Sequence, residues 1–404
     1  MVAQLPKSGS HGSQKTKISA SGGSVGRMPQ PLPEPAAAAL TPIQRTAAYA
    51  LVRDPAGRVL LVRASRRSDL SGHWFLPGGG LRHGESPADA VRRELAEETG
   101  LQVPARAVRP LDASSDVIDL PFRGASLHTV RLIFEVDLPD GEQARQLRSE
   151  PDGTSDEVRF VPPGEAAGLP LMPFVSKQLG LPELPVSVSV PERPEPLLDD
   201  AAAPASTGSH PVPSVLASSV PASSLPGGEP STGPDEADDP ADVGPQDDPG
   251  AVVRVQRPAA YAVLVSGNPN GKGRILLSKL AGSDLWTLPG GGIDHGEPPL
   301  AALTREVYEE AGLRYTPGRL LDISSRHFTG RAPSGRLEDF HGIRLLYAGS
   351  VPDGPAPHVL DVGGSSDDVA WFSLVEIGRV RTVATVRHGL GLLRRAALSG
   401  KLQR

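Results

Sequence analysis

The sequence predicts a mixed α/β protein built from two copies of one domain. A 28-residue stretch at Trp74–Leu101 returns at Trp286–Leu313 with the same glycines and glutamates in the same places. Apolar runs separated by short turns precede each stretch and are typical of β-hairpins. Each stretch itself has the apolar spacing of an amphipathic helix. We therefore expect two tandem α/β domains, each with one helix packed on a mixed sheet.

The composition indicates that parts of the chain cannot form a core. The 404 residues include 45 Gly and 43 Pro, and 38% are hydrophobic. Residues 1–43 are rich in Ser, Gly, Pro and Ala, and residues 183–253 are Pro-rich and acidic. Such segments bury too little apolar surface to offset the entropy of ordering. We expect a disordered N-terminal tail at 1–43, a first domain at 44–182, a disordered linker at 183–253 and a second domain at 254–404.

Several classes of protein are excluded or disfavoured by the same sequence. The absence of Cys excludes disulfides and thiolate metal sites. No apolar run is long enough to span a membrane, and residues 1–43 lack a secretory signal, so we expect a cytoplasmic location. The net charge of −6 comes from the acidic linker, and the remaining basic charge is too weak and scattered to indicate a nucleic-acid surface. The expected partner is a small phosphate-bearing molecule, and the oligomeric state and the packing of the domains stay open.

Matching segments outside the repeated stretch support a duplication of the whole domain. "RTAAYALV" from Arg45 corresponds to "RPAAYAVLV" from Arg257. Further along, "SDEVRF" from Ser155 corresponds to "SDDVAW" from Ser366. The order of elements is therefore the same in both copies: strands, a Gly-rich loop, a helix, further strands and a C-terminal helix.

The repeated stretch contains start and stop signals of a helix. Ser86 supplies an N-cap hydroxyl, Pro87 follows at the first helical position, and Gly100 is a suitable stop. The second copy has Pro298 where a capping hydroxyl is expected, so we predict a weaker cap, while Gly312 again ends the helix.

Three glutamates lie close together on each predicted helix. Their spacing of i, i+3 and i+4 places the carboxylates on one face, beside the apolar stripe. Like charges in partly desolvated positions repel each other, and a hard divalent cation relieves this repulsion. The plain alternative is a solvated acidic face. We expect metal ligation by Glu94, Glu97 and Glu98 in the first copy and by Glu306, Glu309 and Glu310 in the second, with Mg²⁺ or Mn²⁺ as the ion.

A run of three glycines precedes each helix. Consecutive glycines let the backbone approach a ligand or metal and aim its polar groups at it. A simple turn is the alternative. We therefore expect cofactor contacts from loops formed by Gly78, Gly79 and Gly80 and by Gly290, Gly291 and Gly292.

Both stretches resemble the Nudix box. From Gly79 the pattern is Gly, five residues, Glu, seven residues and then "RELAEETGL"; from Gly291 it is the same spacing followed by "REVYEEAGL". The resemblance implies the Nudix fold, an α/β/α sandwich, and Mg²⁺- or Mn²⁺-dependent hydrolysis of a nucleoside diphosphate linked to another group. It implies that the helix glutamates hold the metals, that an arginine orients the carboxylates, and that a further glutamate supports the metal or its water. The implied catalytic residues beyond the helix glutamates are Arg93 and Glu85 in the first copy and Arg305 and Glu297 in the second.

Several other residues have two possible roles. Trp74 and Trp286 could stack on a base or serve the scaffold, and His128 and His341 could act as bases or be structural. Arg131 and Arg344 could reach substrate phosphate or pair with an acid. Glu157, Asp367 and Asp368 are expected in loops before late strands, where related proteins often place an extra base or metal ligand.

The residues that mark specialised substrates in Nudix proteins are missing downstream of both boxes. This favours a small MutT-like domain that hydrolyses nucleoside triphosphates or other nucleoside diphosphate derivatives, in nucleotide pool sanitising or housekeeping. Two alternatives remain: a nucleotide-ligand sensor built on Nudix domains, and one catalytic domain joined to one binding domain. The physiological substrate and the phosphorus that is attacked are not readable from the sequence.

Overall fold

The computed structural model describes residues 39–138, 147–149, 153–192, 252–266, 273–332, 335–352 and 356–398. All described helices and strands lie in one compact unit, Leu40–Arg404. Most of the tail and linker expected to be disordered lies outside the described residues. No helix in the described part of the chain combines the length and the apolar character that a membrane crossing requires.

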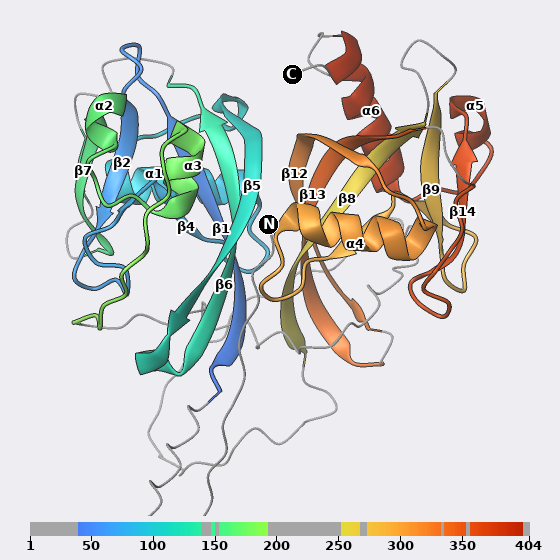
Figure 1. Cartoon of the computed structure of the whole chain (residues 1–404), viewed down its shortest axis with the longest axis horizontal. Coiled ribbons are helices and arrows are strands. Elements are labelled where there is room, and N and C mark those ends of the chain that lie inside the picture. The colour runs from blue at the N-terminus through green and yellow to red at the C-terminus, as the bar shows by residue number, and fades with distance from the viewer. Residues whose placement is uncertain are drawn as a thin grey trace, which may run out of the picture. The chain divides into compact units, whose positions relative to one another are not determined.

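Among the described residues, the first domain contains seven strands, three α-helices and two short 3-10 turns. Figure 1 shows how these elements are arranged. The elements of this domain are β1 (Thr41–Val52), β2 (Val59–Ala64), β3 (Trp74–Phe75), β4 (Gly78–Gly80), α1 (Pro87–Thr99), η1 (Ala105–Ala107), β5 (Val108–Leu120), η2 (Pro121–Arg123), β6 (Ala125–Val136), β7 (Ser155–Val161), α2 (Pro163–Ala166) and α3 (Pro173–Leu179).

The second domain repeats this order. Its elements are β8 (Val253–Ser266), β9 (Arg274–Leu280), β10 (Trp286–Thr287), β11 (Gly290–Gly292), α4 (Pro299–Ala311), β12 (Thr316–Arg331), β13 (Leu337–Val351), β14 (Ser366–Phe372), α5 (Leu374–Ile377) and α6 (Ala384–Leu398).

In the first domain, the central strands are sandwiched between helices. Strands run in the order β4-β1-β6-β5, with β1 and β6 parallel, and a smaller sheet has the order β3-β2-β7. Alternate residues of β1 point to opposite faces, as the period of a strand requires. Ala48 and Ala50 pack in the cluster that contains Leu95 of α1, whereas Tyr49 and Leu51 pack in the cluster that contains Phe174 of α3. This arrangement confirms the expected α/β/α sandwich.

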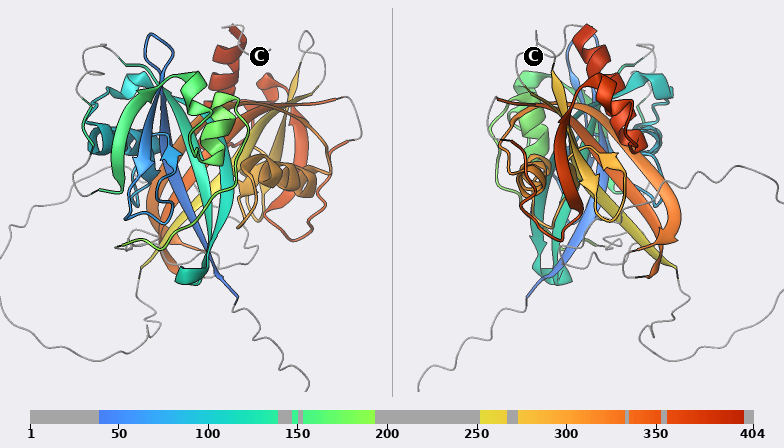
Figure 2. Two further views of the ribbon diagram at one scale, coloured as in Figure 1. Left: turned by 60° about the vertical axis from the view of Figure 1, so that its left-hand side comes forward. Right: turned by 90° about the vertical axis from the view of Figure 1, so that its right-hand side faces the viewer.

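The second domain has the same layers. Its strands run β10-β9-β8-β13-β12, with β11 paired to β8 and β14 paired to β9. Ala262 of β8 packs on the side of Val307 in α4, and Val263 packs on the side of Val386 in α6. Figure 2 shows α6 lying across the strands of this domain. Gly389 permits that approach, because a Cβ there would lie 2.8 Å from a methyl carbon of Val263.

The structure differs from the expected domain boundaries at three places. β1 begins at Thr41 and β8 begins at Val253, inside the segments expected to be disordered. Residues 183–192 follow the first domain, where Ser189 N donates to Asp69 O at 2.8 Å and Glu192 N donates to Arg66 O at 3.0 Å. Backbone pairing of this kind satisfies polar groups in a segment whose composition alone indicates no core.

Two groups of expected loops are strands. The glycine runs form β4 and β11, which pair antiparallel with β1 and β8. Glu157 lies in β7, and Asp367 and Asp368 lie in β14. The flanking strands supply these pairings, which are not visible in the local sequence.

The two domains contact each other through equivalent segments. Gln44 Nε2 donates to Ile293 O at 2.9 Å, and its counterpart Gln256 Nε2 donates to Leu81 O at 3.4 Å. Each glutamine also hydrogen-bonds a buried histidine of its own domain. A contact in which each partner uses the same residues is isologous, as in a two-fold dimer. The duplication therefore forms an approximately two-fold interface within one chain.

Candidate active site

Helix α1 begins and ends where the sequence predicts. The hydroxyl of Ser86 accepts a hydrogen bond from Asp89 N at 3.2 Å, and Pro87 is the first residue of the helix. Gly100 adopts a left-handed conformation with φ 76° at the C-cap. The predicted N-cap and stop are confirmed, and they fix the position from which the glutamates of α1 project.

Helix α4 has the weaker start that the sequence predicts. Its N-cap is Pro298, which makes no side-chain capping bond, and Gly312 ends it with φ 64°. The glutamates of α4 therefore take equivalent positions without help from a capping hydroxyl.

In the first domain, Arg93 gathers three carboxylates. Its Nε and Nη2 donate to the two oxygens of Glu85 at 2.8 and 2.9 Å. Its Nη1 donates to Glu94 at 2.6 Å and to Glu97 at 3.1 Å. Nη2 also donates to Gly80 O at 3.0 Å, which ties the group to β4. A bidentate guanidinium contact restricts orientation as well as distance.

The second domain repeats this network. Arg305 Nε and Nη2 donate to Glu297 at 3.1 and 2.9 Å, and Nη1 donates to Glu306 at 2.8 Å and to Glu309 at 3.2 Å. Gly292 O accepts from Nη2 at 3.0 Å. The structure thus brings together the residues that the sequence predicts, in both copies.

The last glutamate of each set is buried against β4 or β11. Glu98 accepts hydrogen bonds from Gly78 N at 2.8 Å and from the hydroxyl of Ser155 at 2.7 Å. Glu310 accepts from Gly290 N at 3.1 Å and from hydroxyls of serines at 278, 365 and 366. None of these serines is among the site residues predicted from the sequence, although the repeated "SDEV" and "SDDV" segments contain a signal for Ser155 and Ser366.

The glycines position these carboxylates. Gly78 has φ 149°, and a Cβ there would lie 2.2 Å from Ala48 O. A Cβ at Gly79 would lie 2.6 Å from Glu94 Oε1, and one at Gly291 would lie 2.4 Å from the carboxyl carbon of Glu306. Gly79 and Gly291 are required because carboxylates pack directly on their backbone, and Gly78 is required because β1 does.

Electrostatics within the sets favour a bound cation. Burial raises the pKa of Glu306 to about 7, with the charges of Glu310 and Glu309 acting in the same direction and Arg305 opposing them. Burial also raises the pKa of Glu94. Each set has four carboxylates and one guanidinium, which contacts three of them, so a hard divalent cation fits the remaining negative charge and the oxygen donors.

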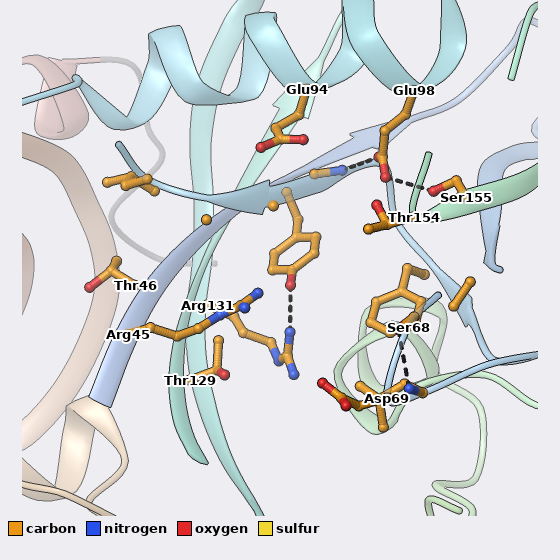
Figure 3. Close-up of a pocket in the computed structure, with 18 of the residues that line it drawn as sticks. Arg45, Thr46, Ser68, Asp69, Glu94, Glu98, Thr129, Arg131, Thr154 and Ser155 are labelled. Carbon is orange, nitrogen blue, oxygen red and sulfur yellow. Dashed lines mark hydrogen bonds between the residues drawn. The ribbon is translucent and has the colours of Figure 1, made fainter. Parts of the chain in front are cut away.

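A cavity of 580 Å³ adjoins the carboxylates of the first domain (Figure 3). Glu94 and Glu98 line it at one end, and Arg45, Thr129 and Arg131 line another part. The Nε of Arg45 is buried and has no hydrogen-bond partner among the described residues. Such a guanidinium can receive an anion. Arg45 is not among the site residues predicted from the sequence, although an arginine recurs at the same place in the second copy.

The residues with two possible roles make contacts within the fold, and Arg131 also lines the cavity. Arg131 pairs with Asp116 through two contacts of 2.8 and 2.9 Å and donates to Tyr49 at 2.6 Å. Trp74 is 4% exposed and packs in the core beside β2. Glu157 pairs with Arg63 at 2.9 Å on the sheet surface.

The matched histidines lie at the interdomain contact. His128 Nδ1 accepts a hydrogen bond from Gln44 Nε2 at 3.0 Å, and His341 Nδ1 accepts the equivalent bond from Gln256 Nε2 at 3.1 Å. Burial lowers the pKa of each ring to about 4, and neighbouring histidines act in the same direction. Both rings are therefore neutral near pH 7 and are held by the interface.

Comparison with known proteins gives a family match in both copies. A model of the NUDIX domain matches residues 43–179 and 255–389. An RNA pyrophosphohydrolase of Psychrobacter sp. (strain PRwf-1) is 42% identical over 80 residues, which are 20% of this chain and 45% of that protein. The nucleoside triphosphatase NudI of Enterobacter sp. (strain 638) is 30% identical over 91 residues, 22% of this chain and 64% of that protein. The chain thus spans less than two thirds of these relatives.

Solved structures with similar sequences include a MutT protein from Methanosarcina mazei Go1. It is 24% identical and the match covers 35% of this chain and 92% of that chain, with a TM-score of 0.27. An 18% identical match is the NUDIX domain of Shewanella oneidensis NrtR in complex with ADP ribose, covering 35% of this chain and 89% of that chain, with a TM-score of 0.28. The family assignment rests on the two matched regions and on the intact boxes. The chain belongs to the Nudix family and carries two tandem Nudix domains.

Proposed function

We propose that the chain hydrolyses the diphosphate linkage of nucleoside triphosphates or other nucleoside diphosphate derivatives, with one active site in each domain. The observation that carries this proposal is the pair of carboxylate sets, each organised by one arginine through the same contacts. Relatives named RNA pyrophosphohydrolase and nucleoside triphosphatase support hydrolysis of phosphoric anhydrides.

The helix glutamates are the residues that would hold Mg²⁺ or Mn²⁺. When bound, such ions neutralise phosphate charge and lower the pKa of a coordinated water. Arg93 and Arg305 orient the carboxylates, and the serine and glycine donors fix Glu98 and Glu310. The full sets proposed are Glu94, Glu97 and Glu98 in the first domain and Glu306, Glu309 and Glu310 in the second.

The reaction itself needs only water as co-reactant. The water oxygen forms a bond to one phosphorus, the anhydride P–O bond breaks, and the bridging oxygen leaves with the other phosphate. The proton of the water passes to solvent or to a nearby carboxylate. Arg45 faces the same cavity as Glu94 and supplies positive charge for the phosphate chain. The cavity volume of 580 Å³ lies within the range of small-ligand sites, about 300–1,000 Å³.

A panel of nucleotides with Mg²⁺ or Mn²⁺ tests the proposal. We expect turnover that EDTA abolishes and either ion restores, with products identified by mass. Reaction in ¹⁸O-water then shows which phosphorus is attacked. Turnover that persists in EDTA, or no hydrolysis of any nucleoside diphosphate derivative, would contradict the proposal.

One observation favours a second candidate, a catalytic first domain joined to a binding second domain. A Cβ at Gly292 would lie 2.5 Å from Arg257 Nη2, so this guanidinium covers the backbone beside the second box. The equivalent Gly80 has no atom within 4 Å of such a Cβ. If Glu98→Gln alone removes all turnover while nucleotide binding persists, this second candidate replaces the first.

A further inference from the structure

Three side chains outside both boxes come together where the two domains meet. His83 belongs to the first domain, and His327 and Asp339 belong to β12 and β13 of the second. One ligand atom from each lies within 4.8 Å of the other two. We call this group the interdomain triad.

The triad has the dimensions of a metal site that needs little adjustment. His83 Nε2 lies 3.2 Å from Asp339 Oδ2, and His327 Nε2 lies 2.5 Å from Asp339 Oδ1. Ligands at about 2.0–2.1 Å in tetrahedral geometry are roughly 3.3 Å apart. The two nitrogens face different oxygens of one carboxylate, and the three ligand atoms lie within 4.8 Å of one another, so small side-chain movements would bring them around one ion.

The environment of His83 points to a missing ligand. Its side chain is 11% exposed, its Nε2 faces Asp339 Oδ2 at 3.2 Å, and its Nδ1 has no hydrogen-bond partner among the described residues. A buried polar group without such a partner is costly. The ring contacts those of His327 and His341 edge to face, with centroids 5.1 and 5.6 Å apart.

The backbone also fits the arrangement. Gly84 has φ +79°, and a Cβ there would lie 2.9 Å from His327 Nδ1. The ring of His327 thus packs directly on the first domain. Arg254 Nε lies 3.8 Å from Asp339 Oδ2 and is the cation that faces the triad from β8.

The approximately related half of the interface does not repeat the triad. Gly296, the counterpart of Gly84, faces Val117, and the counterpart of His83, His295, contacts Ser126 O at 2.9 Å. A histidine and an acid are therefore present in only one of the two equivalent places. Two-fold packing alone does not require them.

We propose that the interdomain triad binds one transition-metal ion of the Zn²⁺ class, which joins the two Nudix domains. Two imidazoles and one carboxylate are borderline donors that suit Zn²⁺ and Co²⁺ better than Mg²⁺. Water can complete the coordination at the exposed edge, where His327 lies. The ion is separate from those of the boxes and serves the interface.

Cobalt binding to the full chain without an affinity tag tests this site. With excess Mg²⁺ present, one equivalent of Co²⁺ should produce the visible absorption typical of low-coordinate cobalt, and Zn²⁺ should displace it. Glu98→Gln with Glu310→Gln should leave the absorption unchanged, which separates this site from the boxes. Its result does not depend on any hydrolytic activity.

The decisive variant is His327→Ala, because this side chain is partly exposed and the fold depends on it little. Co²⁺ affinity should fall on the order of 100-fold or more, since even loss of a supporting contact to a ligand costs about 10–100-fold. His388→Ala is the matched control: it removes a His–Asp pair of similar exposure, with Asp322, that belongs to no group of three such ligands among the described residues. Asp339→Asn provides a second ligand variant.

Absence of one-equivalent Co²⁺ binding in the folded wild-type chain would overturn the proposal and leave an ion pair only. Equal loss in His327→Ala and His388→Ala would also overturn it. The proposal is supported if His388→Ala retains Co²⁺ binding and both His327→Ala and Asp339→Asn lose it, with unchanged circular dichroism in all three variants.

Discussion

The two Nudix domains share a carboxylate network but differ in the residues that lie beside it. Arg93 and Arg305 make the same set of contacts with their glutamates. By contrast, Arg131 pairs with Asp116, whereas its counterpart Arg344 contacts Thr385 at 3.3 Å. Position 116 is an acid, and the matching position, Arg326, is a base. The two copies therefore share the box as a unit and differ in residues that lie beside it.

This difference separates two parts of the proposed site. We expect the box to perform the reaction and the residues beside it to select the substrate. The box can function only with a fixed set of oxygens near a cation. The residues beside the box would contact the rest of a ligand and can differ where the ligand differs. We therefore expect the two domains to use the same reaction on different preferred substrates.

Removing the buried glutamate of each box should have the largest effect. Glu98→Gln and Glu310→Gln each replace an acceptor that faces a backbone N–H and a serine hydroxyl. Each change should lower turnover in its own domain on the order of 10²–10³-fold. The single variants should retain activity from the other domain, and the double variant should lose it. Rates on a common substrate check this, with exposed Glu165→Gln as the control.

Adding one methyl group behind the first carboxylate should have the next largest effect. Gly79→Ala would place Cβ 2.6 Å from Glu94 Oε1 and must displace that carboxylate. We expect a loss of Mg²⁺ affinity in the first domain. Gly80→Ala is the matched control, since a Cβ there meets nothing within 4 Å. Equal Mg²⁺ titrations for the two variants would contradict the positioning role of Gly79.

The two arginines that differ in their partners, Arg131 and Arg344, allow a test by unfolding free energy. Arg131→Met breaks a buried pair and leaves Asp116 without its cation, so it should cost about 3–5 kcal/mol of unfolding free energy. Arg344→Met removes a half-buried guanidinium that has no ion pair in the described part of the chain, and burial lowers the pKa of Arg344. That change should be near neutral. Hydrogen exchange at β6 and β13 measures the loss of stability in each variant. An equal loss of unfolding free energy in Arg131→Met and Arg344→Met would contradict the prediction.

The smallest expected effect is a pH dependence in EDTA. Burial raises the folded-state pKa of Glu306 from 4.5 to about 7. Because the folded state holds this proton more tightly, the stability it contributes is present below pH 4.5 and is lost as pH rises through 7. Glu306→Gln should flatten this slope in denaturant unfolding of the metal-free chain. An unchanged slope would show that Glu306 does not titrate in this range.

Local sequence was enough to predict the boxes. Ser86, Pro87 and Gly100 act through their nearest neighbours, so the limits of α1 follow from short-range rules. The glutamates share a face because of helical spacing, and Arg93 reaches them from the same helix. The duplication can be recognised in the sequence because the same spacing of Gly, Glu and Arg residues occurs twice.

Other features depended on contacts between distant segments. The glycine runs became strands because β1 and β8 offered backbone partners, and Glu157 lies in a strand for a similar reason. Ser155 reaches Glu98 across 57 positions of sequence, and Arg45 reaches the cavity from β1. Residue type and spacing do not encode such distances.

The sequence by itself determined two Nudix boxes, the carboxylates and arginine of each, and the α/β class of both domains, because helix periodicity and capping are local. Only the tertiary structure decided that Gln44 and Gln256 form a reciprocal contact and that His83 meets His327 and Asp339. These residues are separated by long stretches of chain and belong to different domains. Their encounter depends on how two folded surfaces pack, which no local pattern specifies.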